Sequence, residues 1–474
     1  MAELSKRDRM RMGRTPVPLR DPAERVDDFD EVSFGYASGM AVLEASRCLN
    51  CTRQVCVDGC PVGIRIGEFI QLVADGDFSG AAEVIHEDNV LPSVCGRVCP
   101  QEAQCEGACV LARKGRPIAI GYLERFVADE ERKNRITRGP IALPAPTGKS
   151  VAVIGSGPAG LSCAADLVKV GHQVVVYEAL HELGGVLAYG IPSFRLPKDI
   201  VRAEIGELEE LGVVFETDVI IGPGMTVHDL LATEGFDAVF IGTGAGLPRF
   251  PGISGEELIG VYSANEFLTR VNLMAAYDPN TRTPVYDLVD RTAVVIGGGN
   301  TAIDAARTAL RLGAKRVTVL YRRSETELPA RREEVEHARE EGVQMRFLVS
   351  PTAFVGEGGW LRSVTIQRMK LGETDDTGRS RPEPVPDTEE DIRADVAIVA
   401  IGNAPNPVLT RATPALDTSS RGTINVDPVT GETSVPGVFA GGDITTGGAT
   451  VIRALGAGRR AAQGIDRFLC IEGC

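Results

Sequence analysis

One pattern occurs twice in this chain: an apolar strand, a glycine-containing turn, a helix and a second apolar strand. The first copy spans residues 151–178 and the second spans residues 293–323. Each copy is followed by another apolar segment that ends in a Gly-containing turn, at 236–244 and at 394–403. Strands that alternate with helices through short glycine turns are typical of doubly wound parallel sheets. The sequence therefore predicts an α/β fold with two Rossmann-like dinucleotide-binding domains.

The order of segments predicts that one of these domains is inserted in the other. Residues 437–465 contain a short apolar strand, a Gly-Gly-Asp turn and an amphipathic helix, which cannot form a domain alone. We expect them to return to the first domain. A length of 474 residues suggests about three domains. The expected division is 1–140, 149–285 with 404–474, and 286–403, with a Pro-rich linker at 140–148.

Charge and hydropathy exclude some partners. The formal net charge of −15 would repel a nucleic-acid backbone or an anionic membrane. No segment approaches the roughly 18 apolar residues of a membrane span, and no apolar stretch follows the charged N-terminus as in a signal peptide. We therefore expect a cytoplasmic protein that binds neither nucleic acid nor membrane.

The first copy has the pattern Gly155-x-Gly157-x-x-Gly160 between a strand and a helix. Such a turn lets the backbone approach a pyrophosphate and directs the helix N-terminus at its charge. Glu178 ends the second strand, where a carboxylate accepts hydrogen bonds from ribose hydroxyls. Asp443, after Gly442, stands where a carboxylate reaches a flavin ribityl hydroxyl; a plain Asp turn is the alternative. Gly185 is also an expected cofactor-binding residue.

The second copy has Gly297-x-Gly299-x-x-Ala302, followed by Arg322 and Arg323 where the first copy has its acidic residue. Two guanidiniums there would bind a 2′-phosphate that a carboxylate would repel. FAD in the first domain and NADPH in the second fit these roles, with Asn300 expected near the NADPH pyrophosphate. The alternative is that the arginines are simply a solvated strand end.

Eight of the eleven cysteines lie in the first quarter of the chain. Such clustering in a reducing cytosol predicts metal binding rather than disulfides. The first four resemble a two-cluster ferredoxin run, in which the cysteine before Pro ligates the second cluster. Zinc is the alternative, although a zinc ribbon prefers paired CxxC knuckles. The eight are Cys48, Cys51, Cys56, Cys60, Cys95, Cys99, Cys105 and Cys109.

Several segments together resemble one known family over essentially the whole chain. The family is that of the small subunit of NADPH-dependent glutamate synthase and the related large subunit of NADH-dependent ferredoxin:NADP oxidoreductase. Dihydropyrimidine dehydrogenase has a similar module. The segments that carry the resemblance are 47–51, 60–64, 91–109, 120–126, 189–198 and 320–325.

The resemblance implies FAD, NADPH and two [4Fe-4S] clusters bound by an N-terminal helical domain. It assigns one cluster to Cys48, Cys51, Cys56 and Cys109. It assigns the other to Cys60, Cys99, Cys105 and the carboxylate of Glu124, and leaves Cys95 out. Two alternatives stay open: Glu124 is an exposed helix residue, or Cys95 completes the second cluster.

The resemblance also implies a function. We expect the electron-input subunit of glutamate synthase, with a large-subunit partner that makes glutamate from glutamine and 2-oxoglutarate. The first alternative is the flavin subunit of a bifurcating ferredoxin:NADP oxidoreductase, with a ferredoxin-reductase-type small subunit. A zinc-organised module that only senses NADPH is an alternative of another class. No catalytic side chain is expected, because hydride transfer needs only the stacking of two rings.

Overall fold

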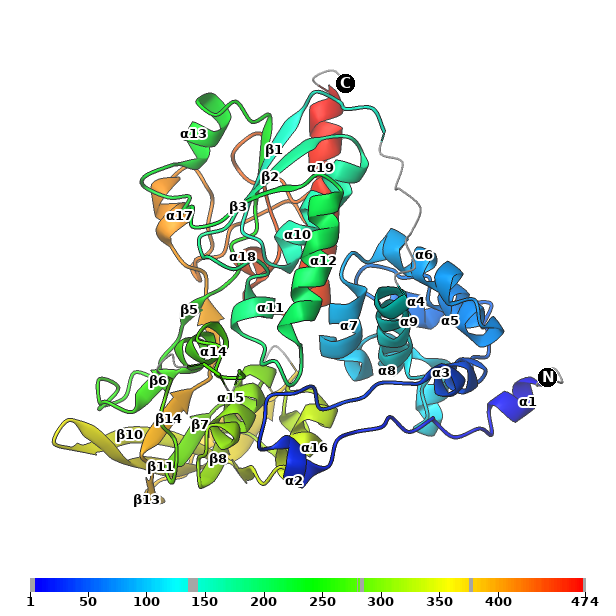
Figure 1. Ribbon diagram of the computed structural model, residues 1–474. Helices are drawn as coiled ribbons and strands as arrows, with labels where there is room; N and C mark the ends of the chain where they lie inside the picture. Colours follow the sequence, from blue (N-terminus) through cyan, green and yellow to red (C-terminus); the bar gives the residue numbers. More distant parts are fainter. Residues whose placement is uncertain (1–4, 135–143, 279, 282–284, 375–377, 472–474) are drawn as a thin grey trace.

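A computed structural model describes residues 5–134, 144–278, 280–281, 285–374 and 378–471. Residues 135–143 lie outside this description, and with them the expected domain end at 140 and the start of the linker. Figure 1 shows a helical N-terminal part beside two α/β parts. In the described residues, no helix is both long and apolar enough to cross a membrane.

The first sheet contains five parallel strands in the order β16-β4-β1-β2-β3. Its central strands are nearly continuous apolar runs because helices cover both faces. The strands are β1 Ser150–Ile154, β2 Gln173–Tyr177, β3 Val214–Glu216, β4 Ala238–Ile241 and β16 Val438–Ala440. The helices are α10 Pro158–Lys169, α11 Val186–Tyr189, α12 Lys198–Glu210, α13 Val227–Ala232, α17 Val408–Ala412, α18 Asp443–Thr446 and α19 Val451–Ile471.

The second sheet repeats the same arrangement in the order β6-β14-β7-β8-β9, again all parallel. Its strands are β6 Val261–Ser263, β7 Thr292–Ile296, β8 Arg316–Tyr321, β9 Gln344–Phe347 and β14 Val396–Val399. Its helices are α14 Ala264–Leu273, α15 Asn300–Arg311, η3 Glu325–Glu327 and α16 Arg332–Glu340. The outer strand β6 precedes residue 286, where the sequence placed the start of this domain.

The connections between the sheets confirm the predicted insertion. The chain leaves the first sheet after β4, builds the second sheet, and returns with β16 at the edge beside β4. The outgoing and returning segments pair as β5 Leu247–Pro248 and β15 Asn403–Ala404. A separate antiparallel sheet extends the inserted part and includes a hairpin formed by β10 and β11. It consists of β10 Val349–Glu357, β11 Trp360–Thr374, β12 Ser380–Pro384 and β13 Glu390–Arg393.

The N-terminal part is helical, as predicted. Helix α7 also packs on the first α/β part, because Leu91 and Val94 share an apolar cluster with α10, α12 and α19. The elements are α1 Lys6–Arg9, α2 Pro22–Arg25, α3 Ser38–Ala45, α4 Val55–Asp58, α5 Ile66–Asp75, α6 Phe78–Asp88, α7 Pro92–Val98, η1 Gln101–Ala103, α8 Cys105–Ala108, η2 Val110–Lys114 and α9 Ile120–Asn134.

An N-terminal segment around α2 ties the helical part to the second α/β part. Arg25 is fully buried, and its Nε donates to Glu341 Oε1 at 2.8 Å. Phe29 and Val32 lie in the apolar core of the second sheet. The Val32 backbone N–H donates to the carbonyl of Phe194 in the first α/β part at 3.0 Å. This one segment therefore contacts both dinucleotide domains.

Candidate functional site

The first glycine turn is shaped by close backbone contacts. Gly155 has φ of +101°, a conformation that disfavours side chains. A Cβ on Gly160 would lie 1.9 Å from the Gly155 carbonyl oxygen, so only glycine lets α10 begin this close to β1. A Cβ on Gly157 would meet nothing within 4 Å. The turn therefore has open space at the N-terminus of α10, where a pyrophosphate is expected.

The Glu178 carboxylate lies beside this turn. Its Oε2 accepts hydrogen bonds from the backbone N–H and hydroxyl of Ser156, at 3.0 and 2.6 Å. The Ser156 hydroxyl in turn accepts from the Gly184 N–H at 3.0 Å. A Cβ on Gly185 would lie 3.0 Å from Gly157 Cα, so the 184–185 turn packs directly against the glycine turn. Sequence reasoning missed Ser156, although its position between two of the glycines was a usable signal.

Asp443 joins the same region from the far end of the chain. It begins α18, and a Cβ on the preceding Gly442 would lie 2.9 Å from Ala159 Cβ at the start of α10. Burial raises the pKa of Asp443, and its Oδ1 accepts from the Ala449 N–H at 3.0 Å. Return of β16 to the first sheet thus places this carboxylate near the first glycine turn.

The second glycine turn has the same combination of close backbone contact and open space as the first. A Cβ on Gly297 would lie 2.3 Å from the Ala400 carbonyl oxygen, whereas one on Gly299 would meet nothing within 4 Å. Asn300 begins α15, and its Oδ1 accepts from the Arg331 N–H at 2.9 Å. The amide therefore connects the glycine turn to the start of α16.

The two arginines after β8 differ in environment. Arg322 is exposed, whereas Arg323 is buried and its Nε donates to the Ser380 carbonyl at 2.8 Å. The alternative of a solvated strand end is therefore wrong for Arg323. Arg379, which the sequence did not single out, reaches the same strand end and donates to the Tyr321 hydroxyl at 2.6 Å. Only the strand pairing of the antiparallel sheet brings Arg379 there.

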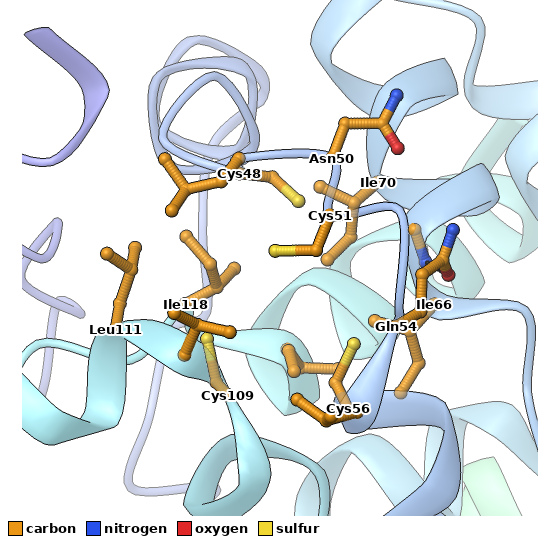
Figure 2. Close-up of a pocket in the computed structure, with 15 residues that line it drawn as sticks. Cys48, Asn50, Cys51, Gln54, Cys56, Ile66, Ile70, Cys109, Leu111 and Ile118 are labelled. Atoms are coloured by element: carbon orange, nitrogen blue, oxygen red, sulfur yellow. Dashed lines mark hydrogen bonds between the residues drawn. The ribbon is translucent and has the colours of Figure 1, made fainter. Parts of the chain in front are cut away.

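Cys48, Cys51, Cys56 and Cys109 line one pocket, which we call the first thiol site. Figure 2 shows their side chains on opposite sides of a shared space, walled by apolar residues such as Ile66, Ile70 and Ile118. Every described cysteine is a free thiol. In the part of the chain that is described, no three His, Cys, Asp or Glu side chains are grouped closely enough to hold a single metal ion.

The closeness of these four thiols affects their pKa values. Burial, and after it the nearby Cys48 and Cys109, together raise the pKa of the Cys56 thiol to about 11. Burial also raises the pKa of Cys48, with smaller contributions from Cys109 and Cys51. Such thiols lose their protons on binding a metal, so occupation of the site would release protons.

Cys60, Cys99, Cys105 and Glu124 form a second group, which we call the second thiol site. Burial is the main reason that the pKa of Cys60 is raised, and Glu124 and Cys99 raise it further. The same two groups and Cys60 raise the pKa of Cys105, after burial and Glu106. The four groups therefore lie within electrostatic reach of one another.

Glu124 and Cys95 both lie beside this group and share the hydrogen-bond partner Asn89. Glu124 is only 5% exposed, so the alternative of an exposed helix residue is wrong. Burial raises its pKa to about 8, and its Oε1 accepts from Asn89 Nδ2 at 2.7 Å. The Cys95 thiol donates to Asn89 Oδ1 at 3.7 Å. Burial raises the pKa of Cys95, and Cys99 and Glu124 raise it further, so Cys95 also lies near this group.

The second thiol site is the one nearer to the first α/β part. A Cβ on Gly456 of α19 would lie 2.9 Å from the carbonyl oxygen of Pro61, the residue after Cys60. On α12, the Glu204 carboxylate accepts from the backbone N–H groups of Ser93 and Val94, at 2.5 and 3.3 Å. It thereby holds the N-terminus of α7, the helix that ends one residue before Cys99. Sequence reasoning missed Glu204, because its partners are 110 or more residues away.

Two family models match the chain. Residues 25–136 match the model described as dihydropyrimidine dehydrogenase domain II, 4Fe-4S cluster. Residues 149–458 match the pyridine nucleotide-disulphide oxidoreductase model. The open space at the two glycine turns fits the phosphates of FAD and NAD(P)H, and the free thiols of the helical part fit an iron–sulfur cluster. The chain therefore has FAD- and NAD(P)H-binding domains and a 4Fe-4S cluster domain.

Individual relatives of known description are similar to this chain over most of its length. The chain is 39% identical to the glutamate synthase [NADPH] small chain of Halomonas elongata, over 95% of this chain and 96% of that protein. It is 42% identical to the NADP(+)-dependent formate dehydrogenase subunit beta of Moorella thermoacetica, over 87% of this chain. The match spans only 60% of that longer relative.

The solved structures support the fold alone. FprA from Mycobacterium tuberculosis in complex with NADPH aligns with a TM-score of 0.57 and 20% identity, covering 68% of this chain and 85% of that one. The family models and the near full-length relatives lead to one conclusion. The chain belongs to the glutamate synthase small-chain family of NAD(P)H- and FAD-dependent oxidoreductases that carry an N-terminal 4Fe-4S cluster domain.

Proposed function

We propose that this chain is the electron-input subunit of an NADPH-dependent glutamate synthase. When bound, NADPH, FAD and two [4Fe-4S] clusters would supply hydride transfer followed by one-electron relay. The protein's own task is to hold these groups in order and to exclude water. A large partner subunit would use the electrons to make glutamate from glutamine and 2-oxoglutarate.

The observation that carries the proposal is the placement of the two thiol sites. The second thiol site adjoins the FAD-binding part through the contact between Pro61 and Gly456. The first thiol site lies near α1, because Arg9 donates to the Cys48 carbonyl at 2.7 Å. In Figure 1, α1 is at the end of the helical part away from both sheets. Clusters at these two sites would form a path from the flavin to the outer end.

We assign the second thiol site to Cys60, Cys99, Cys105 and Glu124, with Cys95 outside it. The influence of Glu124 on both Cys60 and Cys105 supports this choice. Cys95 is left out because the resemblance to the family leaves it out; in the structure it is fully buried and donates to Asn89. The domain boundaries stay predictions, with β6 favouring an earlier start of the NADPH part than residue 286.

On the nucleotide side, we assign Gly155, Gly157, Gly160, Glu178, Gly185, Gly442 and Asp443 to FAD, and Gly297, Gly299, Asn300, Arg322 and Arg323 to NADPH. The open space at Gly157 and Gly299, each at the start of a long helix, supports both phosphate positions. The exposed guanidinium of Arg322 suits a 2′-phosphate. The buried Arg323 would act mainly by shaping the strand end.

A second candidate is the flavin subunit of another electron-transfer complex. The observation that favours it is the 42% identity to a formate dehydrogenase subunit beta. The same chain would then pass electrons to or from a different partner through the same two thiol sites. The bifurcating ferredoxin:NADP oxidoreductase subunit is a further case of this kind.

The experiment has two stages. First, the purified protein is titrated anaerobically with NADPH and, in parallel, NADH, while flavin and cluster absorbance, iron and acid-labile sulfide are measured. We expect NADPH to bleach the flavin and cluster bands at much lower concentration than NADH does. We also expect about eight iron atoms per chain. A Cys60→Ser variant should lose iron yet keep NADPH-reducible flavin, whereas Cys470→Ser at an exposed position should behave like the wild type.

Second, the holoprotein is mixed with a glutamate synthase large subunit, and NADPH-dependent glutamate formation is measured. Formation that requires both chains supports the glutamate synthase assignment. Reduced clusters without glutamate formation would move the assignment to the second candidate. A protein that contains zinc and no iron would refute the electron relay altogether.

A further inference from the structure

The first thiol site is framed by an unusually basic part of the chain. Three segments, 5–14, 47–56 and 109–117, contain ten Lys or Arg residues and a single acidic residue, Asp8. The complete chain has a net charge of −15, so its acidic excess lies entirely outside these segments. Charge on this protein is therefore strongly asymmetric.

Contacts show that the three segments converge on one place. Arg9 donates to the Cys48 carbonyl at 2.7 Å, which brings α1 to the 47–56 segment. The buried Arg47 donates to the Arg116 carbonyl at 2.8 Å, which joins that segment to 109–117. Arg14 donates to the Pro117 carbonyl at 3.3 Å. Cys48, Cys51, Cys56 and Cys109 of the first thiol site belong to two of these segments.

Most of these basic side chains face solvent rather than carboxylates inside the protein. Arg14 pairs with the buried Glu106, and Arg47 pairs with the buried Glu44. The exposed members, which we call the basic face, are Lys6, Arg7, Arg11, Arg53, Arg113, Lys114 and Arg116. Apolar side chains lie among them: Val110, next to Cys109, is 42% exposed and Met10 is 37% exposed.

We propose that the basic face is the docking surface for an acidic electron-accepting protein, which would take electrons from the first thiol site. This inference rests on the proposed function, because it needs a cluster at that site. An acidic partner is favoured because the rest of this chain would repel it, so encounter would be steered to one orientation. The exposed apolar residues would add short-range contact once the two proteins meet.

The test uses two haem proteins of opposite charge as one-electron acceptors. The probes are the acidic soluble domain of cytochrome b5 and the basic cytochrome c, each reduced anaerobically by NADPH through the holoprotein. The variant is Arg7→Glu/Arg11→Glu/Lys114→Glu, none of which is a proposed ligand. The control is Arg362→Glu/Lys370→Glu/Arg393→Glu, at exposed positions in the inserted part.

We expect wild-type kcat/KM for cytochrome b5 to fall steeply as ionic strength rises. The basic-face variant should lose at least about tenfold at low salt, and the control variant should change less than about twofold. For cytochrome c, kcat/KM should instead rise with ionic strength and rise in the basic-face variant. Iron content and the extent of flavin and cluster bleaching by NADPH are measured on every variant, so that misfolding is detected independently. If a charge-reversed variant lost iron, Arg7→Gln/Arg11→Gln/Lys114→Gln would replace it.

The outcomes separate this inference from the proposed function. If NADPH fails to reduce flavin and clusters in the wild type, the proposed function is wrong. If both are reduced but cytochrome b5 reduction is absent, or is insensitive to salt and to the basic-face variant, the docking inference is overturned. It is also overturned if the basic face instead binds phosphatidylserine vesicles, or forms salt-sensitive dimers, without any effect on cytochrome b5 reduction.

Discussion

The Glu204 carboxylate, which links the FAD-binding part to the cluster-binding part, makes a sharp prediction about pH. Burial raises its pKa from 4.5 to about 8, against the opposing effect of the N–H groups of Ser93 and Val94. One pKa unit corresponds to about 1.4 kcal/mol. Ionising Glu204 in the folded protein therefore costs about 5 kcal/mol more than ionising it in the unfolded chain. We predict that Glu204→Gln keeps an acceptor for Ser93 and removes this cost.

Proton binding by Glu204 determines whether the free energy of unfolding rises or falls with pH. Between pH 4.5 and about 8 the folded protein holds a proton on Glu204 that the unfolded chain has released. The contribution of Glu204 to the free energy of unfolding therefore falls as the pH rises through this window. The Gln variant has no titrating group at this position, so its free energy of unfolding lacks this pH-dependent contribution. Its advantage over the wild type should grow by about 3 kcal/mol between pH 5.5 and 8.

The assay is urea unfolding followed by far-UV circular dichroism at several pH values. Glu210→Gln, at an exposed position on the same helix, is the matched control and should show the wild-type pH dependence. Parallel curves for the wild type and Glu204→Gln across this pH range would refute the reasoning. They would mean that water reaches Glu204 and that the two parts separate more easily than their packing indicates.

Three further predictions concern the cofactor sites. Gly160→Ala places a methyl group 1.9 Å from a backbone oxygen and should abolish FAD binding, measured as the flavin to protein ratio, whereas Gly206→Ala, with nothing within 4 Å of its Cβ, should not. Glu124→Ala should lower iron content or alter the electron paramagnetic resonance spectrum of the reduced clusters, and Cys95→Ser should change neither; the reverse pattern would assign Cys95 as the ligand. Arg322→Ala should raise the KM for NADPH about 10-fold to 100-fold with little effect on NADH, and an equal effect on both would argue against a 2′-phosphate contact.

Much of the architecture could be predicted because its signals are local. Each glycine turn, with the apolar strand before it and the helix after it, is readable within about 30 residues. The arginine pair after β8 was also local, and so was the cysteine spacing. What spacing could not decide is which of Arg322 and Arg323 is exposed, because that depends on Ser380 in a strand of another sheet.

The grouping of the cysteines shows the same limit. Counting alone offered eight thiols for two clusters, and only the resemblance pointed to Glu124 in place of Cys95. In the structure, Asn89 bonds to both side chains, and Glu124 raises the pKa of Cys60, Cys105 and Cys95 alike. The packing of α7 against α9 brings Cys95 and Glu124 to the same place, and no local pattern encodes that packing.

The sequence by itself determined that this chain contains two nucleotide turns, an inserted domain and a cysteine-rich helical region, since backbone conformation and hydrophobic period act over a few residues. Only the tertiary structure decided how these parts meet. Glu204 holding α7, Pro61 against α19, and three basic segments around the first thiol site all depend on contacts between distant residues. Such contacts are set by burial and charge pairing in the assembled fold, so they leave no periodic signal in the chain.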